Sequence, residues 1–435
     1  MGNVTLWRRR RLVQGLAGAL LLPALGVRAA APVQLNILTS YPDEVMARFE
    51  AAFEKLYPQY RIRFLWRMPH DALPYLERQG GTDTVDVYWA ASPRTFARLK
   101  ERQLLRKLEI DRSGLPASVG TTQISDPDGY YLATELAGYV LALNERKLAA
   151  LGVAAPGDWH ELANPRLLDN IALPVPSEVG FAPVMYDIVL QAYGWQKGWA
   201  IWSEVAALSQ LIHRGSSFIG DRVGSGDIAI GLSIDFFVKA AISNGAPLSQ
   251  RYPLHNGVNP GHVALPKAGL NADGAQAFAR FVVSPQGQAL LNRSDIRKLA
   301  VRPQTYEAAN AIDFNPFAAA AAGTMNYDGA RGRERLNVIS AVFDQMLARP
   351  HNEQRALWQR VYAAERAGKN VDAVRALLSE APLDETAADS EAVKRLFRDS
   401  LEGGKQQDTA MTQAWADACT ARRGAAGMAL DRIGA

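Results

Sequence analysis

The first two-thirds of the chain alternate short apolar runs with longer amphipathic patterns. The apolar run Leu35–Leu38 has the length of a buried strand, and the polar pair Thr39 and Ser40 follows it directly. After this pair, apolar residues recur every three to four positions, which predicts a helix. The order of strand, polar turn and helix is typical of an α/β fold. The apolar positions of this helix are Val45, Phe49, Phe53 and Leu56.

The same order recurs further along the chain. The run Val85–Ala90 predicts a second strand, and we expect Ser92 and Pro93 to cap and start the helix behind it. A third strand, Ile171–Val175, leads through the loop PSEVG into a helix that begins at about Ala182. Each of these turns places small polar side chains and free backbone N–H groups at the beginning of a helix.

The fourth unit contains the apolar strand Ile228–Ile234, which ends on the carboxylate of Asp235. Because a charged group beside an apolar strand needs a partner, we expect Asp235 to meet a ligand hydroxyl or an arginine of an opposite lobe. Ligands of open α/β sheets bind outside the carboxyl ends of the strands. Four loops of this kind, divided between an N-terminal and a middle segment, predict a cleft between two lobes.

The pattern changes at about residue 315, where strands give way to helical periodicity alone. We expect an α-helical extension that either docks a partner or packs on one lobe as a buttress. If it is a docking element, removing the residues after about 320 should spare ligand binding. The expected division is residues 1–29 as signal peptide, 30–140 and 260–315 as the first lobe, 141–259 as the second lobe and 316–435 as the extension.

The N-terminal segment has the pattern of an export signal. A basic cluster, Arg8–Arg11, precedes the apolar run Leu12–Val27, and small residues follow. The apolar run is shorter than the roughly 20 residues that a membrane span needs, so we expect cleavage near Ala29 and a periplasmic protein. The pattern fits a general secretory signal better than a twin-arginine signal, although both stay open.

Removal of this segment changes the charge of the chain. The whole sequence has 48 basic and 44 acidic residues and a net charge of +4. The signal contains five arginines and no acid, so the mature chain has 43 basic against 44 acidic residues, a net charge of −1. Nucleic-acid binding therefore loses its compositional support, and we expect no nucleic-acid partner.

Motifs for catalysis or cofactor binding are missing from the sequence. The stretch HELAN begins at His160 like a zinc-protease helix, but Asn164 stands where the second histidine is required. There is no nucleophile elbow, Walker loop or dinucleotide fingerprint, and the one cysteine, Cys419, has no partner for a disulfide. We therefore expect neither an enzyme nor a bound cofactor or metal.

Several motifs between residues 33 and 291 fit one known family. They include NILTSYPDEVMARFEAAFEKLYP, DVYWAASP, RVGSGDIAIGLSIDFF and AFARFVVSPQGQALL. Together they resemble the extracellular solute-binding proteins of ABC transporters, in the branch that binds ferric iron and phosphosugars, and the resemblance extends into the helical segment ERLNVISAVFDQML. It implies a two-lobed α/β periplasmic binding protein of type 2, which closes on a small solute.

The resemblance also implies that the loops at the strand ends contact the ligand. Hydroxyls and oriented N–H groups at helix N-termini suit an anion, so we expect a small, anionic, hydroxylated metabolite of the phosphoglycerate or sugar-phosphate type. Two of the candidates are acids, whose repulsion of an anion would have to be offset by a nearby arginine. The candidates are Ser40, Tyr41, Ala91, Ser92, Ser177, Glu178, Gly180, Arg214, Ser216, Ser217 and Asp235.

Two other functions stay open. Ferric-binding relatives use adjacent tyrosines near the fourth strand end, where this chain has Phe236 and Phe237, so an iron carrier is an alternative that these residues disfavour. A secreted hydrolase that uses the cleft carboxylates is the other alternative. For the leading function we expect a monomer whose partner is an ABC permease, a membrane sensor kinase or both.

Overall fold

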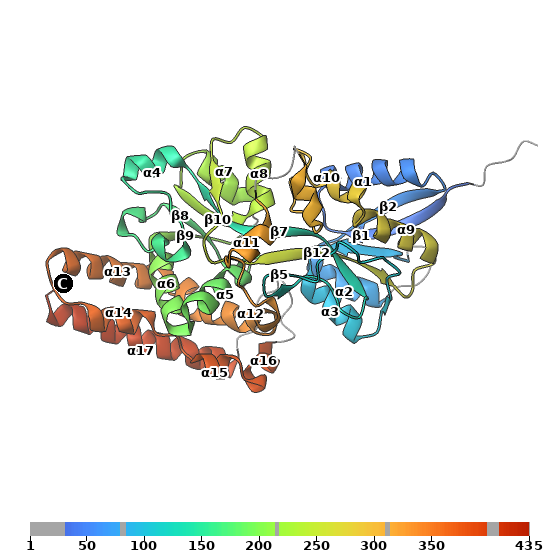
Figure 1. Ribbon diagram of the computed structural model, residues 1–435. Coiled ribbons are helices and arrows are strands. Elements are labelled where there is room, and N and C mark those ends of the chain that lie inside the picture. The colour runs from blue at the N-terminus through green and yellow to red at the C-terminus, as the bar shows by residue number, and fades with distance from the viewer. Residues whose placement is uncertain (1–30, 79–83, 214–216, 309–313, 398–408, 435) are drawn as a thin grey trace, which may run out of the picture.

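The computed structural model describes residues 31–78, 84–213, 217–308, 314–397 and 409–434. The expected signal peptide and its cleavage near Ala29 lie outside these residues. The described chain forms a long mixed sheet with helices on both faces and a set of helices at its C-terminal end (Figure 1). The order of the main strands across the sheet is β2-β1-β3-β12-β7-β10-β8-β9.

The N-terminal half of the sheet packs between two layers of helices. Strand β1 is parallel to β2 and β3, and β12 is antiparallel to β3. Phe49 and Phe53 on one face, and Leu73 and Phe96 on the other, form separate cores, whereas Leu56 is 53% exposed. The elements are β1 Val33–Thr39, α1 Asp43–Leu56, β2 Tyr60–Trp66, α2 Pro69–Glu77, β3 Val87–Ala90, α3 Pro93–Glu101, β4 Leu105–Arg106, β5 Ser118–Val119, β6 Thr122–Gln123, β12 Val258–Pro266, α9 Ala272–Val282 and α10 Pro285–Leu290.

One long strand, β7, connects this half of the sheet to the next. All residues of Tyr131–Leu143 are buried, because β12 pairs with one part of the strand and β10 with the other. Helices α5 and α6 cover one face of the second half, and α7 and α8 cover the other (Figure 1). The elements are β7 Tyr131–Leu143, α4 Glu145–Leu151, β8 Ile171–Pro174, α5 Ala182–Tyr193, α6 Trp195–Leu208, β9 Ser209–Ile212, α7 Ser217–Gly224, β10 Ile230–Ile234, α8 Asp235–Ser243 and β11 Ser249–Arg251.

The predicted helical extension packs along α5 and α6 (Figure 1). The ring centroids of Tyr186 and Phe343 are 4.6 Å apart, and the hydroxyl of Ser203 donates to the carbonyl of Leu378 at 2.7 Å. Trp358 is fully buried in the same core. The elements are α11 Pro316–Ala321, α12 Gly329–Phe343, a π-helical turn Asp344–Ala348, α13 His351–Arg366, α14 Asp372–Ser379, α15 Glu385–Ala388, α16 Glu391–Phe397 and α17 Ala410–Arg432.

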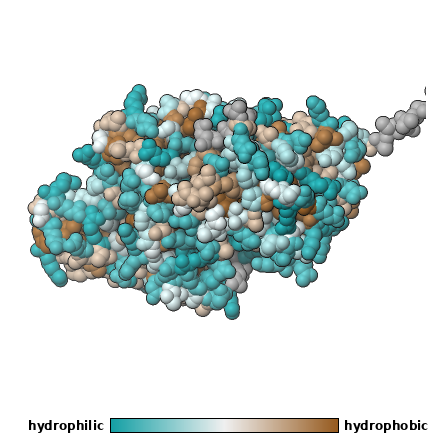
Figure 2. Space-filling model, viewed as in Figure 1, coloured by the Kyte–Doolittle hydropathy of each residue, from teal (hydrophilic) through white to brown (hydrophobic). Residues whose placement is uncertain are grey.

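The extension therefore shares a hydrophobic core with the second half of the sheet. Residues from Val338 to Leu430 belong to the same buried cluster as Trp199 and Trp202 of α6. This arrangement supports the buttress alternative, and it argues against the expectation that the residues after 320 can be removed without affecting ligand binding. The face shown in Figure 2 is mostly hydrophilic, with a paler apolar patch over α11.

None of the helices in the described part of the chain is both long and apolar enough to cross a membrane.

A buried ion pair holds the extension on α5. Arg335 of α12 and Asp187 of α5 are both fully buried, and Nη2 of Arg335 lies 2.6 Å from Oδ1 of Asp187. Burial raises the pKa of Asp187, and the charge of Arg335 acts against this rise. Arg335 also reaches Glu385 at 3.1 Å and Asp389 at 3.2 Å, so its guanidinium is fully engaged.

Replacing Arg335 should destabilise the fold strongly. We expect Arg335→Met to lower the free energy of unfolding by about 3–5 kcal/mol, because it leaves the carboxylate of Asp187 buried without its oppositely charged partner. Arg331→Gln is the matched control, since Arg331 pairs with Glu385 and Asp389 at the surface, and it should cost less than about 1 kcal/mol. Urea unfolding followed by tryptophan fluorescence measures both. Equal losses in the two variants would contradict a special role for the buried pair.

Candidate functional site

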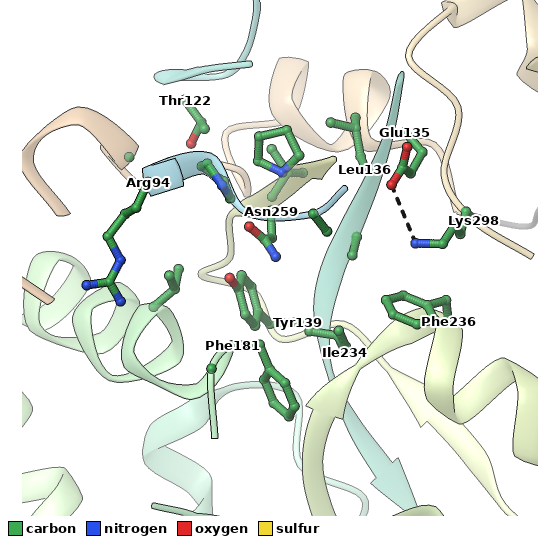
Figure 3. Close-up of a pocket in the computed structure, with 18 of the residues that line it drawn as sticks. Arg94, Thr122, Glu135, Leu136, Tyr139, Phe181, Ile234, Phe236, Asn259 and Lys298 are labelled. Carbon is green, nitrogen blue, oxygen red and sulfur yellow. Dashed lines mark ion pairs between the residues drawn. The ribbon is translucent and has the colours of Figure 1, made fainter. Parts of the chain in front are cut away.

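A cavity of about 440 Å³ lies where the two halves of the sheet meet (Figure 3). Its wall combines the first strand-end loops, the adjoining parts of β7 and β12, the loop before α5 and the start of α8. Residues of α12 complete the wall, namely Gly329, Arg333 and Leu336. The predicted cleft between two lobes is therefore present, and the extension takes part in it.

Five of the predicted ligand contacts line this cavity. They come from three loops that are distant in the sequence, and the fold brings them together at the carboxyl ends of β1, β3 and β8. Whether they touch a ligand stays a prediction. The five residues are Ser40, Tyr41, Ala91, Glu178 and Gly180.

Two predicted serines have other partners. The hydroxyl of Ser92 lies 2.8 Å from that of Thr95, and the residue stands at the N-cap position of α3 without donating or accepting the capping bond that we expected. The hydroxyl of Ser177 donates to Oδ1 of Asp344 at 2.8 Å, in the π-helical turn of the extension. Neither serine is among the residues that line the cavity.

The fourth predicted loop is only partly described. Arg214 and Ser216 lie outside the described residues. Ser217 begins α7, and its side chain is not described. The expectation that this loop contacts the ligand therefore stays a prediction.

Asp235 does not line the cavity, and the partners expected for it were wrong. Its side chain is fully buried at the start of α8. Oδ2 accepts a hydrogen bond from the backbone N–H of Gly138 at 3.0 Å and another from the hydroxyl of Tyr252 at 2.8 Å. Oδ1 accepts from the N–H of Phe236 at 2.7 Å. These bonds join α8 to the middle of β7, so the carboxylate has a structural role.

A charged network at one end of the cavity was missed by the sequence analysis. Nζ of Lys298 lies 3.6 Å from Oε1 of Glu135, and both side chains are almost completely buried (Figure 3). The hydroxyl of Tyr41 donates to the same oxygen of Glu135, and burial, together with this carboxylate, raises the pKa of Tyr41. A side chain at position 261 would overlap both groups, so only Gly261 fits there. Glu135 could have been noticed as an acid inside the apolar run YLATELAG.

Lys298 also joins the two halves of the site. Its ammonium lies 4.8 Å from the ring centroid of Tyr41, which follows β1, and 4.0 Å from that of Phe236 on α8. Contacts of this kind contribute about 1–2 kcal/mol when the cation is shielded from water. The lysine therefore holds aromatic rings from both sides of the cavity in place.

Two arginines mark the opposite end of the cavity. Arg94 of α3 extends into the space at the left of Figure 3, far from the pair of Glu135 and Lys298. It donates a hydrogen bond to the amide oxygen of Asn337 on α12. Arg333, one helical turn before Asn337, also lines the cavity. The sequence analysis assigned the segment that contains Arg333 to the extension and did not connect it with the site.

The remaining acid in the wall is close to the surface. Oε1 of Glu178 lies 3.0 Å from Nδ1 of His213, and both side chains are about half exposed. In the described residues there is no group of three or more His, Cys, Asp or Glu side chains that could hold a metal ion.

Comparison with known proteins places this geometry in a family. Residues 82–317, more than half of the chain, match the model of a family described as "Bacterial extracellular solute-binding protein". The chain is 26% identical over 330 residues to the "Phosphoglycerate transport regulatory protein PgtC" of Salmonella typhimurium, which covers 74% of this chain and 79% of that protein.

Solved structures share the fold at lower identity. One is the periplasmic binding protein AfuA of Actinobacillus pleuropneumoniae, with exogenous fructose-6-phosphate bound. It is 18% identical to this chain with a TM-score of 0.55, and the match covers 69% of this chain and 96% of AfuA. Iron-bound HitA of Pseudomonas aeruginosa is 17% identical with a TM-score of 0.57, and the match covers 71% of this chain and 99% of HitA. These likenesses confirm the predicted type 2 periplasmic binding fold, while the lobe boundaries stay a prediction.

The burial of Asp344 should make the stability of the fold depend on pH, and the hydrogen bond from Ser177 acts against this effect. Burial raises the pKa of Asp344 to about 6, whereas an unfolded aspartate has a pKa of about 3.9. The folded state therefore binds the proton of the Asp344 carboxyl group more tightly than the unfolded state does. The stability that this protonation contributes is lost as the pH rises from about 4 to about 6.

We expect Asp344→Asn to be more stable than the parent protein by about 2 kcal/mol at pH 8 and nearly equal to it at pH 4. Urea unfolding across this range measures the difference. Asp417→Asn, on the exposed side of α17, is the control and should not change the pH profile. A constant difference between Asp344→Asn and the parent protein at every pH would contradict the assignment.

Proposed function

The chain belongs to the bacterial extracellular solute-binding proteins, and on that premise we propose that it captures a small, anionic, hydroxylated metabolite in the periplasm. The negative charge that we propose for the ligand rests on the numbers of basic and acidic side chains in the cavity wall. Three basic side chains, Arg94, Lys298 and Arg333, line the cavity together with two acids, Glu135 and Glu178. Because each acid already has a basic or imidazole partner, the wall favours an anion.

Neutral polar groups of the wall suit the hydroxyls of such a ligand. Ser40, Thr122 and Asn259 line the cavity and can each donate and accept hydrogen bonds. Aromatic and aliphatic side chains cover the rest, as in many metabolite sites, and about 440 Å³ is a volume that suits a metabolite of this size. A ligand that touches both lobes would stabilise the closed arrangement over an open one.

The names of similar proteins narrow the class. PgtC is named for phosphoglycerate transport, and AfuA holds fructose-6-phosphate. Both compounds combine a phosphate with hydroxyl groups, which is the combination that the cavity wall favours. We therefore propose a phosphorylated hydroxy acid or sugar phosphate as the ligand.

Tyrosinate-bound iron is less well supported by the cavity. Phe236 and Phe237 line it, and phenyl rings cannot ligate a metal. Burial raises the pKa of Tyr41 and of Tyr139, which disfavours the phenolate form that iron(III) requires. The hydrolase alternative relied on the cleft carboxylates; Asp235 is not part of the wall, and Glu135, which is, pairs with Lys298.

The remaining expectations complete the proposal. The protein is exported, loses its signal near Ala29 and acts as a monomer. It presents the liganded form to an ABC permease, to a membrane sensor kinase or to both, and it performs no catalysis.

A ligand screen tests the proposal directly. We expect 3-phosphoglycerate or fructose 6-phosphate to raise the melting temperature of the mature protein, because a ligand at 100 times its dissociation constant stabilises the folded state by about 2.7 kcal/mol. Glycerate and fructose, which lack the phosphate, should raise it much less. Stabilisation by iron(III) alone, with a visible tyrosinate absorption band, would replace the proposed function with that of a metal carrier.

A further inference from the structure

Helix α12 reaches the cavity from outside the part of the chain that the family model matches. That match ends at residue 317, whereas α12 begins at Gly329. Thr122 of the first lobe donates to the carbonyl of Tyr327 at 2.7 Å, and a Cβ at Gly329 would lie 3.0 Å from the methyl group of Thr122. The first turn of α12 is thus packed closely against β6, which fixes its place in the wall.

The position of Arg333 on this helix is well determined. Arg335, on another side of the helix, is locked to Asp187, so α12 cannot turn about its axis. Asn337 lies one turn after Arg333 and accepts a hydrogen bond from Arg94. Because residues four apart share a helix face, Arg333 and Arg94 converge on the same end of the cavity.

The charge of Arg333 has no acidic partner among the residues that the structure describes. Its side chain is partly buried, and it forms no hydrogen bond or ion pair with any residue that the structure describes. Its charge acts on Tyr131 and His262, whose pKa values it lowers. Burial lowers the pKa of His262 to about 3, and the charge of Arg333 adds to this effect, so the imidazole is neutral and does not balance the guanidinium.

A tyrosine in the middle of the cavity wall offers a second group without a hydrogen-bond partner. The hydroxyl of Tyr139 is buried in the wall and has no hydrogen-bond partner among the described residues. In Figure 3 Tyr139 lies between Asn259 and Phe181. A buried hydroxyl without a partner loses the free energy of its hydrogen bond to water, and a ligand hydroxyl at this place would restore it.

We propose that the helical extension supplies the anion-binding residue of the site, with Arg333 and Arg94 gripping the phosphate or carboxylate of the ligand between the extension and the first lobe. The proposal rests on the proposed function and makes it more specific. The hydroxylated part of the ligand then points toward Tyr139 and Asn259. Arginine suits this role because its planar fork can donate two hydrogen bonds to one anion.

Three variants of the mature, full-length protein test this assignment. Arg333→Gln removes the charge, Arg333→Lys keeps the charge but not the fork, and Arg331→Gln removes an equal charge from the same helix outside the cavity. The probes are 3-phosphoglycerate and fructose 6-phosphate, each compared with glycerate and fructose, and binding is measured by titration calorimetry at constant ionic strength.

We expect Arg333→Gln to weaken the binding of the phosphorylated probes about 10- to 100-fold and Arg333→Lys to weaken it less. Arg331→Gln should bind like the parent protein. The melting temperatures of unliganded Arg333→Gln and the parent protein should agree, since Arg333 forms no hydrogen bond or ion pair with the described residues.

Two results would overturn the inference, and they can be told apart. Phosphorylated probes that bind the parent protein and Arg333→Gln equally well would overturn the role of the extension alone and leave the proposed function intact. A parent protein that binds none of the anions would overturn the proposed function and the role of Arg333 with it.

Discussion

The buried ion pair between Asp187 and Arg335 is the interaction on which the arrangement of the site depends. Burying two charges is costly unless both are fully hydrogen-bonded. Here the carboxylate of Asp187 accepts bonds from Nε and Nη2 of Arg335 at 2.9 and 2.6 Å and from Gln191 at 2.9 Å. The pair can form these bonds only when α12 occupies one position on α5. This contact therefore helps to fix where the residues of α12 lie relative to the cavity.

The two halves of the sheet meet in a comparable way. Strand β7 is common to both, and Asp235 fixes the start of α8 to its middle by accepting the N–H of Gly138. Glu135, three residues earlier, holds Lys298, which in turn contacts aromatic rings from both sides. The cavity thus has a rigid floor made of satisfied charges. Among the described residues of the wall, the guanidinium of Arg333 and the hydroxyls of Tyr139 and Tyr327 have no hydrogen-bond partner.

The features that the sequence predicted are those that depend on residues close together in the chain. Apolar runs and the turns behind them gave the strand and helix order, and the helix predicted from about Ala182 begins at that residue. Strand ends were less accurate, since β10 begins at Ile230 and not at Ile228, and β3 begins at Val87 and not at Val85. Three of the four predicted loops, those after β1, β3 and β8, contribute residues to one cavity. Strand β8 runs antiparallel to β1 and β3, so the meeting of these loops follows from the pairing of both halves of the sheet with β7.

Contacts between distant residues were beyond that reasoning. The partners of Asp235 are Gly138 and Tyr252, 97 and 17 positions away, and no local pattern marks them. The same holds for Arg335, whose partner Asp187 is 148 positions away. Because contacts of this kind hold α12 at the cavity, the contribution of the extension to the wall could not be foreseen from periodicity.

The corrected role of Asp235 also removes an electrostatic objection to an anionic ligand. Two acids near a phosphate would each oppose binding by about 1 kcal/mol or more at close range. Asp235 is outside the wall and accepts three hydrogen bonds, which draw its charge toward Gly138, Phe236 and Tyr252. Glu178 is half exposed, so water screens it, and His213 stands beside it. The acid that does lie deep in the wall, Glu135, is balanced by Lys298, which leaves the arginine end of the cavity as the dominant field that a ligand meets.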